Sequence, residues 1–344
     1  MLRIAASLFV FAPALAAQTP AAAPCDLIRT VTARQDGQMA LSIREYSAAV
    51  KAFQQALEAC PTDHDALLGM SKANLALRRW PEAIQSTRRL VEADPSSEQA
   101  HLLLADAYFM AQRLPEALEQ AQLVLKVEPA QPGALKLKGN IEYLTGQLDS
   151  ALDTFISLLD HNPQDEEAAY MLGRIYYQEG RVDHAVGQFQ RALKINPQSY
   201  KAYDNLGLCY QALGDNELAT RYFLTAIKLV EKDHPDYDWA YANLSSLLYD
   251  KGDYEKAYGA ASKAAGRNPY SARNFYLGGK ALAKLGKNEL CVNWLERSVS
   301  LDPNYPEPLY LLARVYAQLG QDDKAKTALE KFQALKATAP RQRK

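Results

Sequence analysis

Prolines divide this chain at a fixed interval of 34 residues. The interval separates Pro61, Pro95, Pro129, Pro163 and Pro197, widens to 38 residues before Pro235, and returns to 34 at Pro269 and Pro303. A fixed period of about 20 to 50 residues indicates a repeat array, in which each unit buries its faces only against its neighbours. With each proline numbered position 32, nine units begin at Thr30, His64, Glu98, Pro132, Glu166, Tyr200, Asp238, Ala272 and Pro306.

Two columns of the aligned units contain only small residues. Position 8 has Gly37, Ser71, Ala105, Gly139, Gly173, Gly207, Ser245, Gly279 and Ala313, and position 20 has Ala49, Ala83, Ala117, Ala151, Ala185, Ala219, Ala257, Cys291 and Ala325. Helices approach closely where neither has a bulky side chain, so these columns predict the contact between the first and second helix of each unit. Large apolar residues recur at helical spacing around them, including Phe53, Phe155, Phe189 and Phe223 at position 24.

Glycines mark where the first helix of most units ends. Position 15 is Gly146, Gly180, Gly214, Gly252, Gly286 and Gly320 in six units, and glycine adopts the left-handed conformation that closes a helix. The position-32 proline ends the second helix, because the residue before a proline is pushed out of helical geometry. The first three units have Arg44, Arg78 and Gln112 at position 15. We therefore expect their hairpins to close differently.

These columns resemble those of the tetratricopeptide repeat (TPR) family. Repeat 5 fits best, with Leu172-Gly173, Tyr176, Gly180, Ala185, Phe189, Ala192 and Pro197, and the resemblance covers roughly residues 30–339. It implies an all-α protein, a right-handed α-solenoid of about nine helix-turn-helix repeats, with the first helix of each repeat lining the concave surface. The composition agrees, since 48 % of residues are apolar and only 17 are glycines.

The interval between Pro197 and Pro235 contains four extra residues, near 228–235. Four residues make about one helical turn, so we expect the second helix of repeat 6 to be longer without losing its buried face. The insertion is either neutral or bends the array between repeats 6 and 7.

The first residues have the pattern of a secretory signal peptide. A basic start at Arg3 precedes an apolar stretch from Ile4 to Ala17, and Ala14-Leu15-Ala16 has the small-x-small form of a cleavage site. We expect residues 1–17 to be removed, 18–29 to be a spacer leading into the first helix, and 340–344 to be a basic tail. The pattern predicts a periplasmic or secreted protein, with no integral membrane segment after cleavage.

Four cysteines are present. Cys25 lies just before the first helix of repeat 1 and Cys60 ends the second, and antiparallel helices bring those ends together. In an oxidising compartment these two form either a disulfide or two unpaired thiols. Cys209 and Cys291 fall at packing positions, where we expect both to be buried and reduced.

No pattern of catalytic, metal-ligating or cofactor-binding residues is found. The five histidines are scattered without a second ligand at metal spacing, and neither a GxxxxGK[ST] loop nor a GxSxG elbow occurs. The 39 basic and 40 acidic residues leave a net charge of −1, which gives no electrostatic footprint for nucleic acid. We therefore predict no enzymatic activity, no cofactor and no nucleic-acid partner.

In the TPR family, positions 2, 5, 9, 12 and 13 of the first helix face the concave groove. Carried onto this chain, the resemblance implies a partner-binding surface of aromatic and basic residues at Tyr170, Arg174, Tyr177, Trp239, Tyr249, Arg273, Tyr276, Lys280, Tyr310 and Arg314. Such residues form binding hot spots, and the basic ones favour acidic ligands. The alternative is that several of these tyrosines fill space between adjacent helices.

The first repeats differ, with apolar residues at groove positions: Leu68, Leu75, Leu102, Phe109, Met110 and Leu144. Large exposed apolar patches are rarely without function. This one predicts a second contact surface or self-association, unless the N-terminal segment covers it.

These patterns favour a non-catalytic scaffold that binds a protein or an extended peptide, serving envelope assembly, secretion or complex organisation. The alternative is a regulatory or substrate-recruiting subunit of an enzyme whose catalytic chain is separate.

Overall fold

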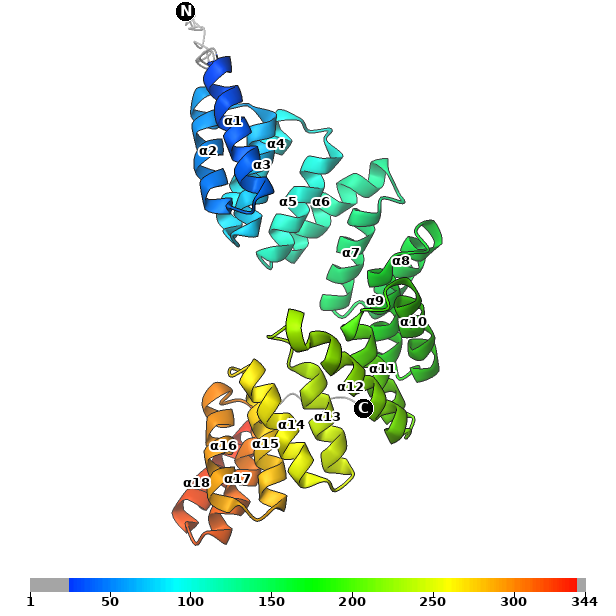
Figure 1. The fold of residues 1–344 in the computed structure, drawn as a ribbon, viewed down its shortest axis with the longest axis vertical. Helices are drawn as coiled ribbons and strands as arrows, with labels where there is room; N and C mark the ends of the chain where they lie inside the picture. Colours follow the sequence, from blue (N-terminus) through cyan, green and yellow to red (C-terminus); the bar gives the residue numbers. More distant parts are fainter. Residues whose placement is uncertain (1–24, 339–344) are drawn as a thin grey trace, which may run out of the picture. The chain divides into compact units, whose positions relative to one another are not determined.

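The computed structural model describes residues 25–338, and the predicted signal peptide and basic tail fall outside this range. The described chain is all-α, as predicted, and contains eighteen helices and no strand (Figure 1). They are α1 (Leu27–Ser42), α2 (Tyr46–Ala59), α3 (His64–Ala76), α4 (Trp80–Ala93), α5 (Glu98–Met110), α6 (Leu114–Val127), α7 (Pro132–Leu144), α8 (Leu148–His161), α9 (Glu166–Gln178), α10 (Val182–Ile195), α11 (Tyr200–Ala212), α12 (Asn216–Asp233), α13 (Trp239–Asp250), α14 (Tyr254–Arg267), α15 (Ala272–Lys284), α16 (Asn288–Leu301), α17 (Pro306–Gln318) and α18 (Asp322–Thr338). Each predicted repeat is one pair of consecutive helices.

The helices form two compact units. The N-terminal unit extends to Val124 and holds repeats 1 to 3, and the C-terminal unit begins at Leu125 and holds repeats 4 to 9. Within each unit the second helix of a repeat packs against the first helix of the next, as α2 does on α3 and α10 does on α11. Each repeat therefore buries its apolar faces mainly against its sequence neighbours, as a solenoid requires.

The two small-residue columns meet inside each hairpin. The hydroxyl of Ser245 at position 8 donates to the carbonyl of Ala257 at position 20 (2.8 Å). In repeat 8 the direction is reversed, and the thiol of Cys291 at position 20 donates to the carbonyl of Gly279 (3.2 Å). The predicted contact between the first and second helix is confirmed.

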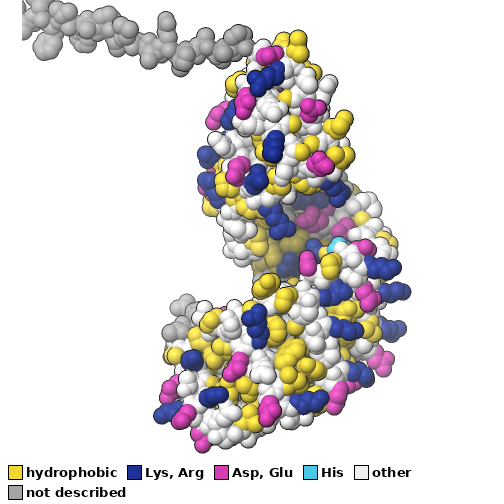
Figure 2. Space-filling view, turned by 60° about the vertical axis from the view of Figure 1, so that its left-hand side comes forward, with side chains coloured by type: hydrophobic (Ala, Val, Ile, Leu, Met, Phe, Trp, Pro, Cys, Tyr) yellow, Lys and Arg dark blue, Asp and Glu magenta, His cyan; other side chains and the backbone are white. Residues whose placement is uncertain are grey.

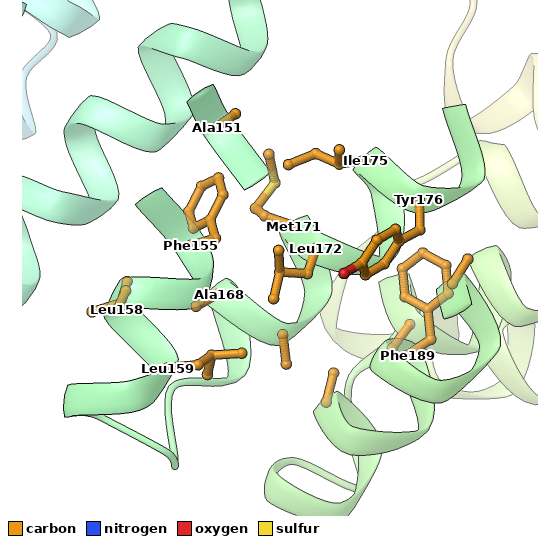
Figure 3. Close-up of a cluster of buried hydrophobic side chains, with 14 of the residues drawn as sticks. Ala151, Phe155, Leu158, Leu159, Ala168, Met171, Leu172, Ile175, Tyr176 and Phe189 are labelled. Atoms are coloured by element: carbon orange, nitrogen blue, oxygen red, sulfur yellow. The ribbon is translucent and has the colours of Figure 1, made fainter. Parts of the chain in front are cut away.

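Position 8 also makes room for the position-24 aromatic ring. A Cβ added to Gly139 would lie 2.8 Å from the Phe155 ring, and one added to Gly173 would lie 2.6 Å from the Phe189 ring. Both rings are fully buried. Figure 3 shows Phe155 and Phe189 on either side of Leu172 and other α9 side chains, so that α8 and α10 each insert a ring into this core.

The hairpins of repeats 1 to 3 close in the same way as the others, and the expectation that they differ was wrong. Arg44, Arg78 and Gln112 have φ values of 62°, 57° and 60°, and the six position-15 glycines have values from 69° to 82°. The hydrogen bonds also match: Arg44 N–H donates to the Leu41 carbonyl (3.1 Å), as Gly180 N–H donates to that of Tyr177 (3.0 Å). The packing of the two helices holds a non-glycine residue in the left-handed conformation at a cost of about 1 kcal/mol.

The four extra residues of repeat 6 extend its second helix. The α12 helix has 18 residues, where the second helix of most repeats has 14. The loop after it is held by Arg267 of α14, whose guanidinium donates to the carbonyls of Val230 (3.3 Å), His234 (3.0 Å) and Pro235 (3.3 Å). The inserted turn is thus anchored to the next repeat.

A disulfide joins Cys25 to Cys60 across the open end of repeat 1, where Asp26 N–H also donates to the Ala59 carbonyl (3.1 Å). These links attach the start of α1 to the end of α2. Cys209 and Cys291 are both buried and unpaired, as expected.

Candidate partner-binding groove

Two clefts of the C-terminal unit are lined largely by the first helices of repeats, where the predicted groove residues lie. The first, which we call the central cleft, has a volume of about 830 Å³ and is formed by α9, α11, the loop after α12, and α13. Its lining is Glu166, Glu167, Tyr170, Met171, Arg174, Lys201, Asp204, Asn205, Leu208, Tyr237, Trp239 and Asn243. Three of the predicted residues, Tyr170, Arg174 and Trp239, are brought together here.

Aromatic rings position Arg174 in the central cleft. The Arg174 guanidinium donates to the Tyr143 hydroxyl (3.0 Å) and lies 4.8 Å from the centre of that ring and 5.9 Å from that of Tyr170. Burial raises the pKa of the Tyr170 hydroxyl to about 12. Trp239 is 55 % exposed and lies beneath the Arg273 guanidinium (5.4 Å). The exposed indole offers apolar surface to a ligand in this cleft.

A buried carboxylate that we did not predict lies at the base of the central cleft. Asp204 of α11 accepts hydrogen bonds from the Tyr237 hydroxyl (2.7 Å) and the Asn243 amide (3.0 Å). The Asn243 carbonyl oxygen in turn accepts from Arg273 (3.0 Å). Burial raises the pKa of Asp204 to about 6, against the lowering effect of these two hydrogen bonds.

The signal for this network was present in the sequence at position 5 of repeat 6. Asp204 occupies a groove position of the first helix, but the predicted groove surface contained only aromatic and basic residues. Tyr237 precedes repeat 7 by one residue, where most repeats have a Ser or Asp that caps the following helix, such as Asp165. In repeat 7 the helix begins one residue later and Asp238 takes the N-cap position, so Tyr237 is not the cap and its hydroxyl donates to Asp204 instead.

The second cleft, which we call the C-terminal cleft, has a volume of about 310 Å³ and lies among α13, α15, α17 and α18. It collects five of the predicted residues, Tyr249, Tyr276, Lys280, Tyr310 and Arg314. The remaining lining is Glu307, Leu311, Phe332 and Lys336.

Contacts with aromatic rings hold several side chains that line the C-terminal cleft in place. The Lys280 ammonium lies 3.9 Å from the centre of the Tyr249 ring, and Tyr310, 47 % exposed, packs against Phe332 with ring centres 5.3 Å apart. Burial raises the pKa of Tyr249 and of Tyr276, so both hydroxyls are neutral near pH 7. The cleft therefore offers positive charge and aromatic surface together.

Two predicted residues line neither cleft. Tyr177 is half-buried and packs against the apolar core around α9 and α11. Arg273 of α15 is half-buried, donates to the Asn243 side chain and lies over the Trp239 ring. Its desolvation lowers the pKa of the guanidinium, although neighbouring acidic groups oppose this. Arg273 thus positions the central cleft and is poorly placed to be a contact residue.

The apolar residues predicted in the first repeats do not form one patch. Leu68 and Leu102 line a cleft of about 510 Å³ in the N-terminal unit, together with Lys72, Glu98 and Gln99. Leu75 and Phe109 are half-buried and Met110 is exposed. Leu144 is exposed but belongs to the C-terminal unit.

Metal sites, membrane-spanning helices and, on the face that Figure 2 shows, strongly charged surfaces are not evident among the described residues. Over residues 25–338 no group of His, Cys, Asp and Glu side chains could hold a metal ion. Within the same range no helix is long and apolar enough to span a membrane. Acidic and basic side chains are interspersed on the face shown in Figure 2, without a continuous field of one sign.

The repeat pattern is matched by known proteins. Profiles described as tetratricopeptide repeat match residues 37–98, 71–134, 136–200, 199–264 and 306–338, and one described as TPR repeat matches 279–320. The chain belongs to the tetratricopeptide-repeat family. The eighteen helices are accordingly nine TPR units in the described range.

Solved TPR structures are similar in fold. A tetratricopeptide repeat protein from Parabacteroides merdae matches with a TM-score of 0.59 and 20 % identity, covering 73 % of this chain and 98 % of that one. The Cut9-Hcn1 hetero-tetramer of APC/C contains a chain that matches with a TM-score of 0.60 and 18 % identity, covering 85 % of this TPR chain and 57 % of its own length. At these identities the likeness establishes the fold alone.

A sequence relative covers a shorter stretch. Protein CTR9 homolog of Arabidopsis thaliana is 37 % identical over 90 residues, which are 25 % of this chain and 8 % of the relative. This TPR chain therefore spans a small part of that protein.

Proposed function

We propose that this TPR protein is a non-catalytic scaffold outside the cytoplasm, which binds a protein or an extended peptide along the central and C-terminal clefts. Within that role it serves envelope assembly, secretion or the organisation of a complex. The observation that carries the proposal is the exposed aromatic surface in both clefts, where Trp239 is 55 % and Tyr310 is 47 % exposed. Trp and Tyr are enriched among the few residues that dominate the binding energy of protein interfaces.

Two further observations support the proposal. The Cys25–Cys60 disulfide suits an oxidising compartment, as does the signal-peptide pattern of residues 1–17. The Cut9-Hcn1 structure is a hetero-tetramer, so a chain of similar fold is built into a protein complex there.

Site-directed photo-crosslinking tests the binding surface. A photo-reactive phenylalanine analogue at Trp239 or Tyr310 should crosslink a partner in intact cells. The same analogue at Leu224, which is 50 % exposed on α12 and lines neither cleft, should not. Equal crosslinking from all three positions would contradict a groove-bound partner.

Fractionation tests the location. The mature chain should be recovered outside the cytoplasm with its N-terminus just after Ala16 or Ala17. A cytosolic chain that retains residues 1–16 would contradict export.

A further inference from the structure

Among the residues that the structure describes, the cations of the C-terminal cleft have no acidic partner in an ion pair. Over the described residues, no carboxylate lies within 4.0 Å of the charged groups of Lys280, Arg314 or Lys336. Four cations elsewhere in the C-terminal unit do have an acidic partner, among them Lys136 with Asp165 (2.8 Å). Of the cleft's charged lining, three residues are basic and Glu307 alone is acidic, so the balance is 3 − 1 = +2. The central cleft, with three acidic and two basic lining residues, has a balance of 2 − 3 = −1.

Aromatic rings hold part of this charge in place. Lys280 lies over the Tyr249 ring (3.9 Å), and Lys336 lies 5.9 Å from the centre of the Phe332 ring. A cation over a ring is stabilised without its charge being neutralised, so its N–H groups remain able to bind a carboxylate. The C-terminal cleft is therefore prepared for negative charge beside an apolar surface.

The last repeat supplies that apolar surface by departing from a repeat column. Position 27, in the second helix, is at most 3 % exposed in repeats 1 to 8, as at Ala56 and Ser298. In repeat 9 the same position is Phe332, which is only partly buried and packs on Tyr310 in the cleft. The helix continues for another turn beyond the usual length, to 17 residues, and so places Lys336 beside the ring.

We propose that the C-terminal cleft binds an acidic peptide segment of the partner protein. Carboxylates of the segment pair with Lys280, Arg314 and Lys336, and one aromatic or large aliphatic side chain packs against Tyr310 and Phe332. This assignment rests on the proposed function and names the chemistry of the partner. It applies to this cleft alone, because the charge balance of the central cleft has the opposite sign.

Labelled peptides test the assignment on the full mature chain. The probe is a fluorescein-labelled nonapeptide with a central phenylalanine flanked by glutamates, and matched probes replace every glutamate by glutamine or the phenylalanine by alanine. Fluorescence anisotropy at low ionic strength should give a Kd at least ten-fold lower for the glutamate probe than for either matched probe. The difference between glutamate and glutamine probes should shrink as salt is added.

Charge reversal in one cleft provides the matched control. Lys280→Glu combined with Arg314→Glu should remove the preference for the glutamate probe, whereas Lys201→Glu in the central cleft should leave it unchanged. Circular dichroism and thermal unfolding verify that each variant folds. Equal affinities for the glutamate and glutamine probes, or an unchanged preference in the double variant, would overturn the assignment.

The crosslinking experiment separates this inference from the proposed function. If the glutamate probe shows no preference while Tyr310 still crosslinks a partner in cells, the scaffold role holds and the acidic ligand is wrong. If the probe binds with the expected charge dependence while no position crosslinks a partner, the ligand chemistry holds and the cellular role is wrong.

Discussion

The N-terminal and C-terminal units build the same hairpin from different residues. In repeats 4 to 9 a glycine closes the first helix, whereas in repeats 1 to 3 Arg44, Arg78 and Gln112 adopt the same left-handed conformation with the same hydrogen bonds. The N-terminal unit therefore contains three strained turns that the C-terminal unit avoids. The N-terminal unit also contains the Cys25–Cys60 disulfide. Repeat geometry is set by packing between helices, and turn residues change its energy more than its shape.

The largest predicted difference in stability between the two units comes from the disulfide of the N-terminal unit. Cys25→Ser combined with Cys60→Ser should lower the free energy of opening α1 by about 3 kcal/mol, because the crosslink closes a loop with a sequence separation of 35. Hydrogen exchange should show faster exchange of α1 amides and unchanged exchange in α17, since a solenoid unfolds locally. Unchanged α1 protection would show that packing alone holds this end.

In the C-terminal unit, the buried Asp204 should make the free energy of unfolding depend on pH. Its folded pKa of about 6 lies above the ordinary aspartate value of 3.8, so its stabilising contribution is complete below pH 3.8 and is lost as the pH rises through 6. Relative to an Asp204→Asn variant, the free energy of unfolding should therefore rise by about 2 kcal/mol between pH 7.5 and 4.5.

Chemical denaturation of both proteins at several pH values measures this difference, and the variant cancels the contributions of other carboxylates. A parallel pH dependence in the two proteins would mean that Asp204 titrates normally.

A smaller effect is expected at a glycine turn of the C-terminal unit. Gly180→Ala should destabilise by about 1 kcal/mol, because φ is 75° there and an added Cβ would meet no atom within 4 Å, leaving only the backbone cost. The control is Gly187→Ala in α10, where the Cβ also meets nothing but the backbone is helical. That change should instead stabilise, by about 0.5 kcal/mol. Loss of stability in both variants would contradict a conformational cause.

The smallest effect is the reverse change in the N-terminal unit. Arg78→Gly should stabilise by about 0.5 kcal/mol, since it relieves a φ of 57° but adds the flexibility of glycine to the unfolded chain. Arg79→Gly, one residue later at a φ of −89°, should destabilise by a few tenths of a kcal/mol. Thermal unfolding of the pair measures the difference. A destabilised Arg78→Gly would show that this turn is not strained.

Much of the fold was predictable because a repeat presents each packing rule nine times. The small columns at positions 8 and 20 identified the helix contact, which the Ser245–Ala257 bond confirms. The turns of repeats 1 to 3 were mispredicted because local preference for glycine was weighed without the packing that overrides it. At Arg44 that packing holds a φ of 62° in a residue that ordinarily avoids it.

The candidate site was less predictable than the fold. Family positions led to eight residues that line the two clefts, but they did not separate the clefts or distinguish Arg273, which supports Asn243. The Asp204 network was missed because Tyr237 reaches it from 33 residues away, through the loop that follows the lengthened α12. The residues found at one repeat position do not reveal a contact between two different positions in neighbouring repeats.

Hydrogen bonds connect Tyr237 to Asp204, Asp204 to Asn243, and Asn243 to Arg273, and they make neighbouring repeats depend on one another. These bonds join side chains of repeats 6, 7 and 8 and the loop between the first two, so these repeats are not interchangeable parts. A chimaera that replaced repeat 7 by a consensus unit would keep the helical stack. It would leave Asp204 and Arg273, which lie on either side of the replaced unit, without the amide that links them. Engineering of this array should therefore treat repeats 6 to 8 as one indivisible block and draw exchangeable modules from elsewhere.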